Sequence, residues 1–235
     1  MTGFFDYPKG AAFGRVLPKN KIYEHAGASA ALKDLFIKEV DQIVWTYKLA
    51  PETINLAATR SVSEIQIFSV SLRKAELNLD VLRAIDRAIP FPLVFELTWS
   101  GKRKAVAAFK RPSEADSSKW VVSEYFESAW VEEAVPRRPL PMSLNLGALY
   151  EQMLSALMPE QAAPDEDIQA RVARMEAIRA KTREVERIKA RLDREKQFNK
   201  RVGINAELRA AKQRLAELQQ KKLADADDRQ STASE

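Results

Sequence analysis

The chain has 235 residues, 46% of them hydrophobic and 30% charged, with a net charge of +5. This balance is typical of a protein that buries a core, so disorder throughout the chain is excluded. Cysteine is absent, which excludes disulfides and thiolate zinc sites and favours a cytoplasmic protein. We expect no signal peptide and no membrane span, because no basic-then-apolar start and no long apolar run is present.

The first elements are predicted from apolar periodicity. Residues 29–40 repeat apolar side chains at helical spacing and predict a helix. IVWTYKL at 43–49 is rich in β-branched and aromatic residues, and SEIQIFSVSL at 63–72 alternates, so both predict strands. LDVLRAIDRAI at 79–89 carries one apolar helical stripe and predicts a helix that ends before Pro90.

Three further strands follow along the chain. PLVFELTW at 92–99 and KAVAAFKR at 104–111 predict two strands joined by a hairpin turn at Ser100-Gly101, and WVVSEYFESAW at 120–130 predicts another. Hairpins rather than repeated βαβ units indicate an α+β fold. We therefore expect a mainly antiparallel sheet with helices on one face, followed by a long C-terminal helix or coiled coil.

The domain organisation follows from a change in composition near residue 160. We expect an α+β globular domain over residues 1–137 and a proline-containing linker with a short helix over 138–164. A basic coiled-coil helical arm is expected over 165–224, and a disordered tail over 225–235.

An apolar seam with heptad spacing runs along the arm and favours a coiled coil. The seam is formed by Ile168, Met175, Ile178, Val185, Leu192, Leu208 and Leu215. Its phase is interrupted near Gly203, where we expect one long helix, with a hairpin turn at that glycine as the alternative. A narrow stripe needs a partner, and a homodimer through the coiled coil is the simplest one.

The basic excess of the protein lies in the arm. Between Glu166 and Lys222 there are 17 lysines and arginines against 9 acids, a net charge of +8. One interpretation is a solvated coiled-coil surface with ion pairs between successive turns. The other is that these charges bring the arm onto nucleic acid by contacting phosphates, although Phe198 is the arm's only aromatic residue.

A metal-dependent nuclease is the enzymatic alternative. It requires Asp41 beside Glu64 to hold a divalent ion, with a lysine two residues after the second acid. That position is Gln66, so the site would be a degenerate PD-(D/E)xK-like one, with Lys48 reaching in from the neighbouring strand. The other interpretation is that Glu64 is an exposed strand carboxylate, and we predict no catalytic residue.

Other chemistries lack the residues that they require. His25 is the single histidine, and neither GxxxxGK[ST] nor GxGxxG occurs, so imidazole metal clusters and the common phosphate-binding loops are excluded. We expect no cofactor and no metal.

Two basic clusters in the globular part are candidate phosphate contacts. PKNKIYEH at 18–25 and SGKRKAV at 100–106 form one patch if the strand hairpin lies near the first of them. The alternative is that both are solvated turns. The candidate nucleic-acid-binding residues are Lys19, Lys21, Lys102, Arg103 and Lys104.

Several long blocks carry a family resemblance. LPKNKIYE, VDQIVWTYKLAPETINL, EIQIFSVSL, LDVLRAIDRAIPFPLVFEL and REKQFNKRVGINAELR resemble a bacterial family of about this length, described only as a domain of unknown function. The resemblance implies a gene beside helicases and DNA methyltransferases in restriction-like phage-defence loci, and no established catalytic residues. That family has a helix former where Gly203 stands, which argues against a hairpin turn there.

The expected function is that of a non-enzymatic accessory or adaptor subunit of such a DNA-defence system. Its expected partners are a helicase or methyltransferase subunit, which the resemblance implies, and DNA. The alternative is the divalent-metal-dependent DNA nuclease with the degenerate site.

Overall fold

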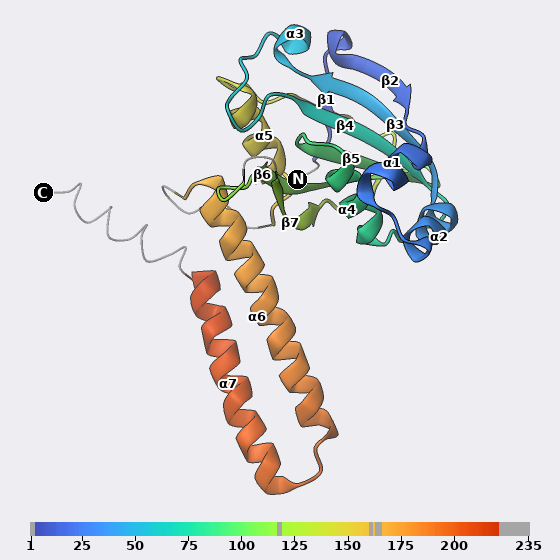
Figure 1. Ribbon diagram of the computed structural model, residues 1–235. Helices are drawn as coiled ribbons and strands as arrows, with labels where there is room; N and C mark the ends of the chain where they lie inside the picture. The colour runs from blue at the N-terminus through green and yellow to red at the C-terminus, as the bar shows by residue number, and fades with distance from the viewer. Residues whose placement is uncertain (1–2, 117–118, 160–161, 163–165, 221–235) are drawn as a thin grey trace, which may run out of the picture. The chain divides into compact units, whose positions relative to one another are not determined.

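The computed structural model describes residues 3–116, 119–159, 162 and 166–220 (Figure 1). The chain divides into two compact units, Met1–Pro159 and Glu160–Glu235. We call the first unit the head and the described part of the second the helical hairpin. The tail expected over 225–235 lies outside the described residues. None of the described helices is long and apolar enough to cross a membrane.

The head is built on a twisted sheet in which most neighbouring strands are antiparallel (Figure 1). Only the pair β4–β5 within this sheet is parallel. In spatial order the strands are β2 (Ala12–Val16), β3 (Val40–Leu49), β4 (Ile65–Leu72), β5 (Leu93–Trp99), β6 (Lys102–Pro112) and β7 (Trp120–Glu127), with β8 (Val131–Glu132) also on β6. A separate parallel pair joins β1 (Phe5–Asp6) to β9 (Arg138–Pro139).

Short helices lie between these strands and, in the case of α5, after the last of them. They are η1 (Lys9–Ala11), α1 (Lys19–Ala26), α2 (Ala30–Glu39), α3 (Pro51–Ile54), α4 (Leu79–Ala88) and α5 (Leu146–Ser155). Side chains of Ser29, Asn78 and Asn145 accept backbone N–H groups in the first turns of α2, α4 and α5, which explains where these helices begin. The head thus confirms the expected α+β class with a mainly antiparallel sheet.

The two faces of the sheet are both covered. On one face Phe68 of β4 and Phe95 of β5 pack with α1, α2 and α4 in a single hydrophobic core. On the other, Tyr150 of α5 stacks on Phe109 of β6, with ring centroids 6.3 Å apart. The expectation of helices on one face therefore describes α1, α2 and α4 but misses α5. Because both faces of the sheet are covered, Ile67 and Phe68 are equally buried although they point to opposite faces. The alternation of residues in β4 therefore does not identify a solvent-exposed face.

The turn between β5 and β6 confirms the predicted hairpin. Ser100 and Gly101 have φ angles of 49° and 75°. Left-handed backbone at both central positions is the geometry that matches the twist of paired strands in a two-residue turn. Glycine adopts it without strain, and this explains the signal in the sequence.

The second unit contains two antiparallel helices, α6 (Ile168–Arg194) and α7 (Phe198–Gln220) (Figure 1). The prediction of one long helix is wrong, because the chain turns at residues 195–197. Gly203 is not the turn, since it lies inside α7 with open space where a side chain would stand. The guanidinium of Arg201 donates to the carbonyls of Leu192 and Glu195 and satisfies the end of α6.

The apolar seam lies between the two helices of this hairpin. On α7, Ile204, Leu208 and Ala211 are buried at heptad spacing, with Leu215 half-buried one turn later. On α6, Met175 and Ile178 are buried, and Ile168, Val185 and Leu192 are half-buried. The seam was expected to need a second chain, but α7 of the same chain supplies its partner helix.

Candidate nucleic-acid interface

Three of the four candidate nuclease residues lie together at one end of the sheet. Lys48 and Gln66 are opposite one another on β3 and β4. Glu64 accepts a hydrogen bond from the Gln66 amide at one oxygen, and its other oxygen lies 3.5 Å from the Lys48 ammonium. Lys48 also lies 2.6 Å from Glu52, and this hydrogen bond raises the pKa of Lys48. Both oxygens of Glu64 are therefore already engaged by protein groups.

Asp41 does not join this cluster. It lies at the opposite end of β3 from Lys48, about 20 Å away along the strand, and its carboxylate is 2.7 Å from Arg73. Within the described part of the chain, no three Asp, Glu or His side chains are grouped so that they could hold a metal ion. The nuclease arrangement of Asp41 beside Glu64 is thus wrong, because Asp41 lies at the start of β3, and Glu64, directly before β4, lies beside the far end of β3.

The lysines of α1 serve the head internally. The ammonium of Lys19 donates to the carbonyls of Phe36 and Val40, at 3.2 and 2.6 Å, where α2 ends. Partial burial there lowers the pKa of Lys19. Lys21 lies 3.4 Å from Glu24 one turn along α1. PKNKIYEH, treated above as a loop or turn, is largely helical.

The basic residues of the β5–β6 hairpin are also engaged. Lys102 pairs with Glu132 at 3.5 Å and Lys104 with Glu127 at 2.7 Å. Arg103 is buried, its guanidinium 4.4 Å from the centre of the Phe4 ring. Arg103 therefore cannot contact a phosphate, and the five candidate lysines and arginines do not form a shared patch of unpaired cations.

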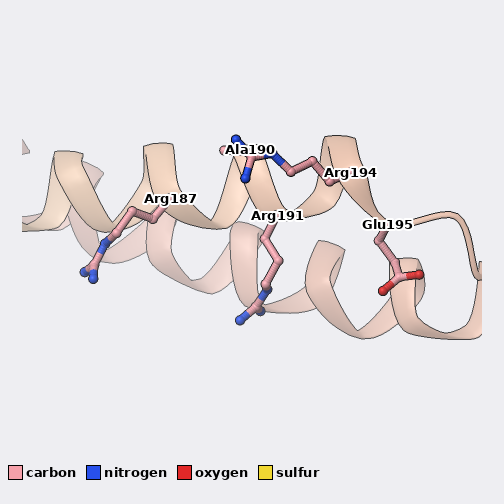
Figure 2. Close-up of a pocket in the computed structure, with 5 residues that line it drawn as sticks. All are labelled: Arg187, Ala190, Arg191, Arg194 and Glu195. Carbon is pink, nitrogen blue, oxygen red and sulfur yellow. The ribbon is translucent and has the colours of Figure 1, made fainter.

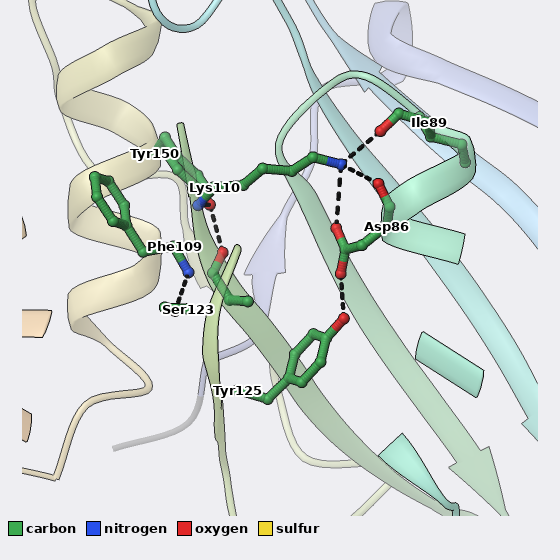
Figure 3. Close-up of polar contacts among 8 residues, drawn as sticks. Asp86, Ile89, Phe109, Lys110, Ser123, Tyr125 and Tyr150 are labelled. Carbon is green, nitrogen blue, oxygen red and sulfur yellow. Dashed lines mark hydrogen bonds and ion pairs between the residues drawn. The ribbon is translucent and has the colours of Figure 1, made fainter. Parts of the chain in front are cut away.

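A network of buried polar side chains links α4 to the sheet of the head (Figure 3). Lys110 of β6 is only 2% exposed and donates to the carbonyls of Asp86 and Ile89 at the end of α4. Its ammonium is 3.4 Å from the Asp86 carboxylate, whose other oxygen accepts from the Tyr125 hydroxyl. Burial raises the pKa of Asp86 and lowers that of Lys110. A cation is favourable at a helix C-terminus, so this network fixes α4 in place.

A tyrosine hydroxyl completes the same region from the other face of the sheet. Tyr150 of α5 donates to the carbonyl of Ala108 and accepts from the N–H of Lys110 at 2.9 Å, while Ser123 accepts from the N–H of Phe109 (Figure 3). The register between β6 and β7 shifts here, so these backbone groups lack their usual strand partners. The role of the network is structural.

This network was not predicted from the sequence. Lys110 stands beside Arg111 at the end of KAVAAFKR, where nothing in the local pattern marks it as buried. A signal was present at Asp86, which follows Ile85 and stands four residues after Leu82, on the buried side of α4. An acid on an apolar helix stripe requires a buried partner.

The hairpin presents a different kind of charge. Arg183, Arg187, Arg191 and Arg194 of α6, here called the arginine face, are all exposed. At about 100° per residue, Arg187 and Arg194 lie on the side of α6 away from the seam residue Val185.

Two shallow grooves run along this face. One, of about 410 Å³, is lined by Arg187, Ala190, Arg191, Arg194 and Glu195 (Figure 2). The other, of about 730 Å³, is lined by Ala180, Arg183, Glu186, Arg187 and Ala190. Because they share Arg187 and Ala190, they form a continuous surface, and the small alanines leave room between the guanidinium groups.

The arginines of this face differ in their ion-pair partners. Arg191 pairs with Glu207 of α7, whereas Arg187 and Arg194 have no ion-pair partner among the residues that the structure describes. Glu195 accepts the backbone N–H of Gln197, and this hydrogen bond lowers the pKa of Glu195. An exposed row of guanidinium groups can bind phosphate oxygens in pairs of hydrogen bonds.

Comparison with known proteins gives the family. The model of a family described as "Domain of unknown function (DUF4391)" matches residues 5–215. The chain therefore belongs to this family. No curated protein and no solved structure matches it.

Proposed function

We propose that this protein is a non-enzymatic accessory subunit that binds DNA through the arginine face of its helical hairpin. The observation that carries the proposal is the contrast within α6, where Val185 and Leu192 pack on α7 while Arg187 and Arg194 stay exposed and unpaired in the described chain. Duplex DNA carries a phosphate every few ångströms, so a continuous row of cations matches its charge.

The length of the arginine face suits this role. From Arg183 to Arg194 the helix rises by about 16 Å, which spans several phosphates of one strand. Glu186 and Glu195 interrupt the row, and contacts of this kind carry no base information. We therefore propose binding without sequence preference, with any sequence recognition left to the partner.

The head is proposed to bind the partner protein. The family resemblance suggests a helicase or a DNA methyltransferase of a restriction-like phage-defence system as that partner. Co-expression of the full chain with a helicase and with a DNA methyltransferase from such a locus of the same genome tests this part. We expect one of them to co-elute with the chain in gel filtration, and separate elution of all three would contradict the adaptor role.

The DNA-binding part is tested with two charge-matched variants of the full chain. Arg187→Ala/Arg194→Ala removes two charges from the hairpin, and Lys21→Ala/Lys102→Ala removes two exposed charges from the head. Fluorescence anisotropy with a labelled duplex should show affinity lowered roughly tenfold by the first variant at low salt and little changed by the second. Equal loss in both variants, or no loss in either, would contradict the assignment to the arginine face.

The nuclease alternative has its own assay. We expect no DNA cleavage when the purified full chain is incubated with Mg²⁺ or Mn²⁺, because the oxygens of Glu64 are held by Lys48 and Gln66. Cleavage that disappears in Glu64→Ala would overturn the non-enzymatic assignment. The same preparation must bind duplex DNA in the anisotropy assay, which excludes an inactive sample.

A further inference from the structure

The turn of the hairpin carries an exposed apolar pair. Phe198 is 78% exposed and Val202 is 55% exposed, and both belong to the first turns of α7. Residues four apart lie on the same side of a helix, and this side is turned away from the buried Ile204. A large aromatic side chain left in water is unfavourable unless something covers it.

Cations surround this pair. Arg194, Lys196 and Lys200 are all exposed, and none of them has an ion-pair partner in the described ranges. The nearby Arg201 is different, because its guanidinium donates to the carbonyls of Leu192 and Glu195, at 3.4 and 3.0 Å. The tip of the hairpin therefore combines an apolar centre with a positive rim.

The turn is held in one conformation. Glu195 accepts the N–H of Gln197 at 2.8 Å, and Arg201 closes the end of α6. Phe198 is thus presented from a fixed position and does not need to be ordered at the moment of binding, so less conformational entropy is lost.

We propose that this tip binds DNA at unpaired bases, with the ring of Phe198 stacked on a base and Lys196 and Lys200 on the adjacent phosphates. The inference rests on the proposed function and deepens it by naming the DNA structure. The surface of the tip matches this ligand, because unpaired DNA offers apolar base faces for the apolar pair beside a dense row of phosphates for the cations. Base stacking on aromatic side chains tolerates any base.

The proposed tip would act together with the arginine face. The face contacts the duplex backbone without regard to sequence, and the tip adds affinity only where bases are exposed, as at a fork or a single-stranded end. Val202 would cover the edge of the stacked base. The chain would then prefer forked DNA to a blunt duplex of equal length.

The test measures binding of the full chain to a forked and a blunt duplex by anisotropy. Phe198→Ala should lower affinity for the fork by roughly 5- to 100-fold and change affinity for the blunt duplex less than about twofold. Phe198→Trp should retain the preference. The matched control is Met142→Ala in the head, where Met142 is 97% exposed, and it should change neither affinity. Because Phe198 is so exposed, helical circular dichroism should be unchanged in its variants.

Four results would overturn the proposal. The first two are equal binding of fork and blunt duplex by the unaltered chain, and an unchanged preference for the fork in Phe198→Ala. The third is that the unaltered chain binds phosphatidylserine vesicles and Phe198→Ala does not. The fourth is that the unaltered chain self-associates in sedimentation and Phe198→Ala does not. The last two would assign the tip to a membrane or to a second copy of the chain. If Arg187→Ala/Arg194→Ala weakens duplex binding while Phe198→Ala does nothing, the tip proposal fails and the proposed function stands.

Discussion

The head and the helical hairpin use charge in opposite ways. In the head, Lys110 lies in the interior against Asp86, and Arg137 binds Glu96 with two hydrogen bonds of 2.7 and 2.6 Å. In the hairpin, the packing is apolar and Arg187 and Arg194 stand in water. Charged residues of the head thus hold elements together, whereas Arg187 and Arg194 play no such part in the hairpin.

This difference shows that the mild excess of +5 is not spread over one surface. A cation that is buried and hydrogen-bonded is committed to the fold, because removing its partner leaves an uncompensated charge. A cation that is exposed and unpaired can bind a phosphate at little cost in folding free energy. The comparison therefore makes two kinds of prediction, on stability for the head and on binding for the hairpin.

The largest expected effect is on the buried pair. Lys110→Ala should destabilise the head by about 3–5 kcal/mol, because Asp86 would stay buried without its cation. All four tryptophans lie in the head, so urea unfolding followed by tryptophan fluorescence reports this unit alone. Lys21→Ala, in an exposed pair, is the control and should cost less than about 1 kcal/mol. Similar losses in the two variants would break the distinction between interior and surface charge.

A smaller effect is expected where α5 meets the sheet. Tyr150→Phe keeps the ring on Phe109 but removes the hydroxyl that serves Ala108 and Lys110, which leaves buried backbone groups unpaired. We expect a loss of about 1–3 kcal/mol in the same fluorescence experiment. Tyr23→Phe, whose hydroxyl has no hydrogen bond within the described residues, should change stability little. An unaffected Tyr150→Phe protein would mean that the network does not hold β6 to α5.

The smallest effect concerns the hairpin and has the opposite sign. Gly203→Ala should stabilise α7 by about 0.5–1 kcal/mol, because alanine has the better helix propensity and nothing lies within 4 Å of its methyl group. Thermal unfolding followed by helical circular dichroism measures it. Destabilisation would place Gly203 at a turn and contradict a helix that continues through it.

Much of the head could be predicted from local pattern. The strand at 63–72, the helix at 79–89 and the Ser100-Gly101 turn each depend on neighbours in the sequence, and each is present. The packing of α5 on the other face of the sheet could not be predicted, because the hydrogen bond between Tyr150 and Lys110 joins residues 40 positions apart in the sequence. Likewise, Asp41 and Glu64 looked adjacent until the register set them at different ends of the sheet.

One long helix was expected in the arm, and the hairpin was only the alternative. The heptad seam indicated that the arm packs on a partner, and its break of phase near FNKRVGIN was a real signal of the turn. It was assigned to Gly203 because glycine is the usual helix breaker. The turn lies instead at residues 195–197, without glycine or proline, and depends on the guanidinium of Arg201 reaching back to Leu192. A contact of this kind has no local sequence signature.

The salt dependence of duplex binding tests most directly whether the helical hairpin binds DNA. The slope of log affinity against log salt counts the phosphates that the protein contacts. Relative to the unaltered chain, the slope should become shallower by about 2 in Arg187→Ala/Arg194→Ala and stay the same in Lys21→Ala/Lys102→Ala. If the slope instead became shallower only in the head variant, DNA would bind to the head, and the account of the hairpin as the DNA-binding part would be wrong.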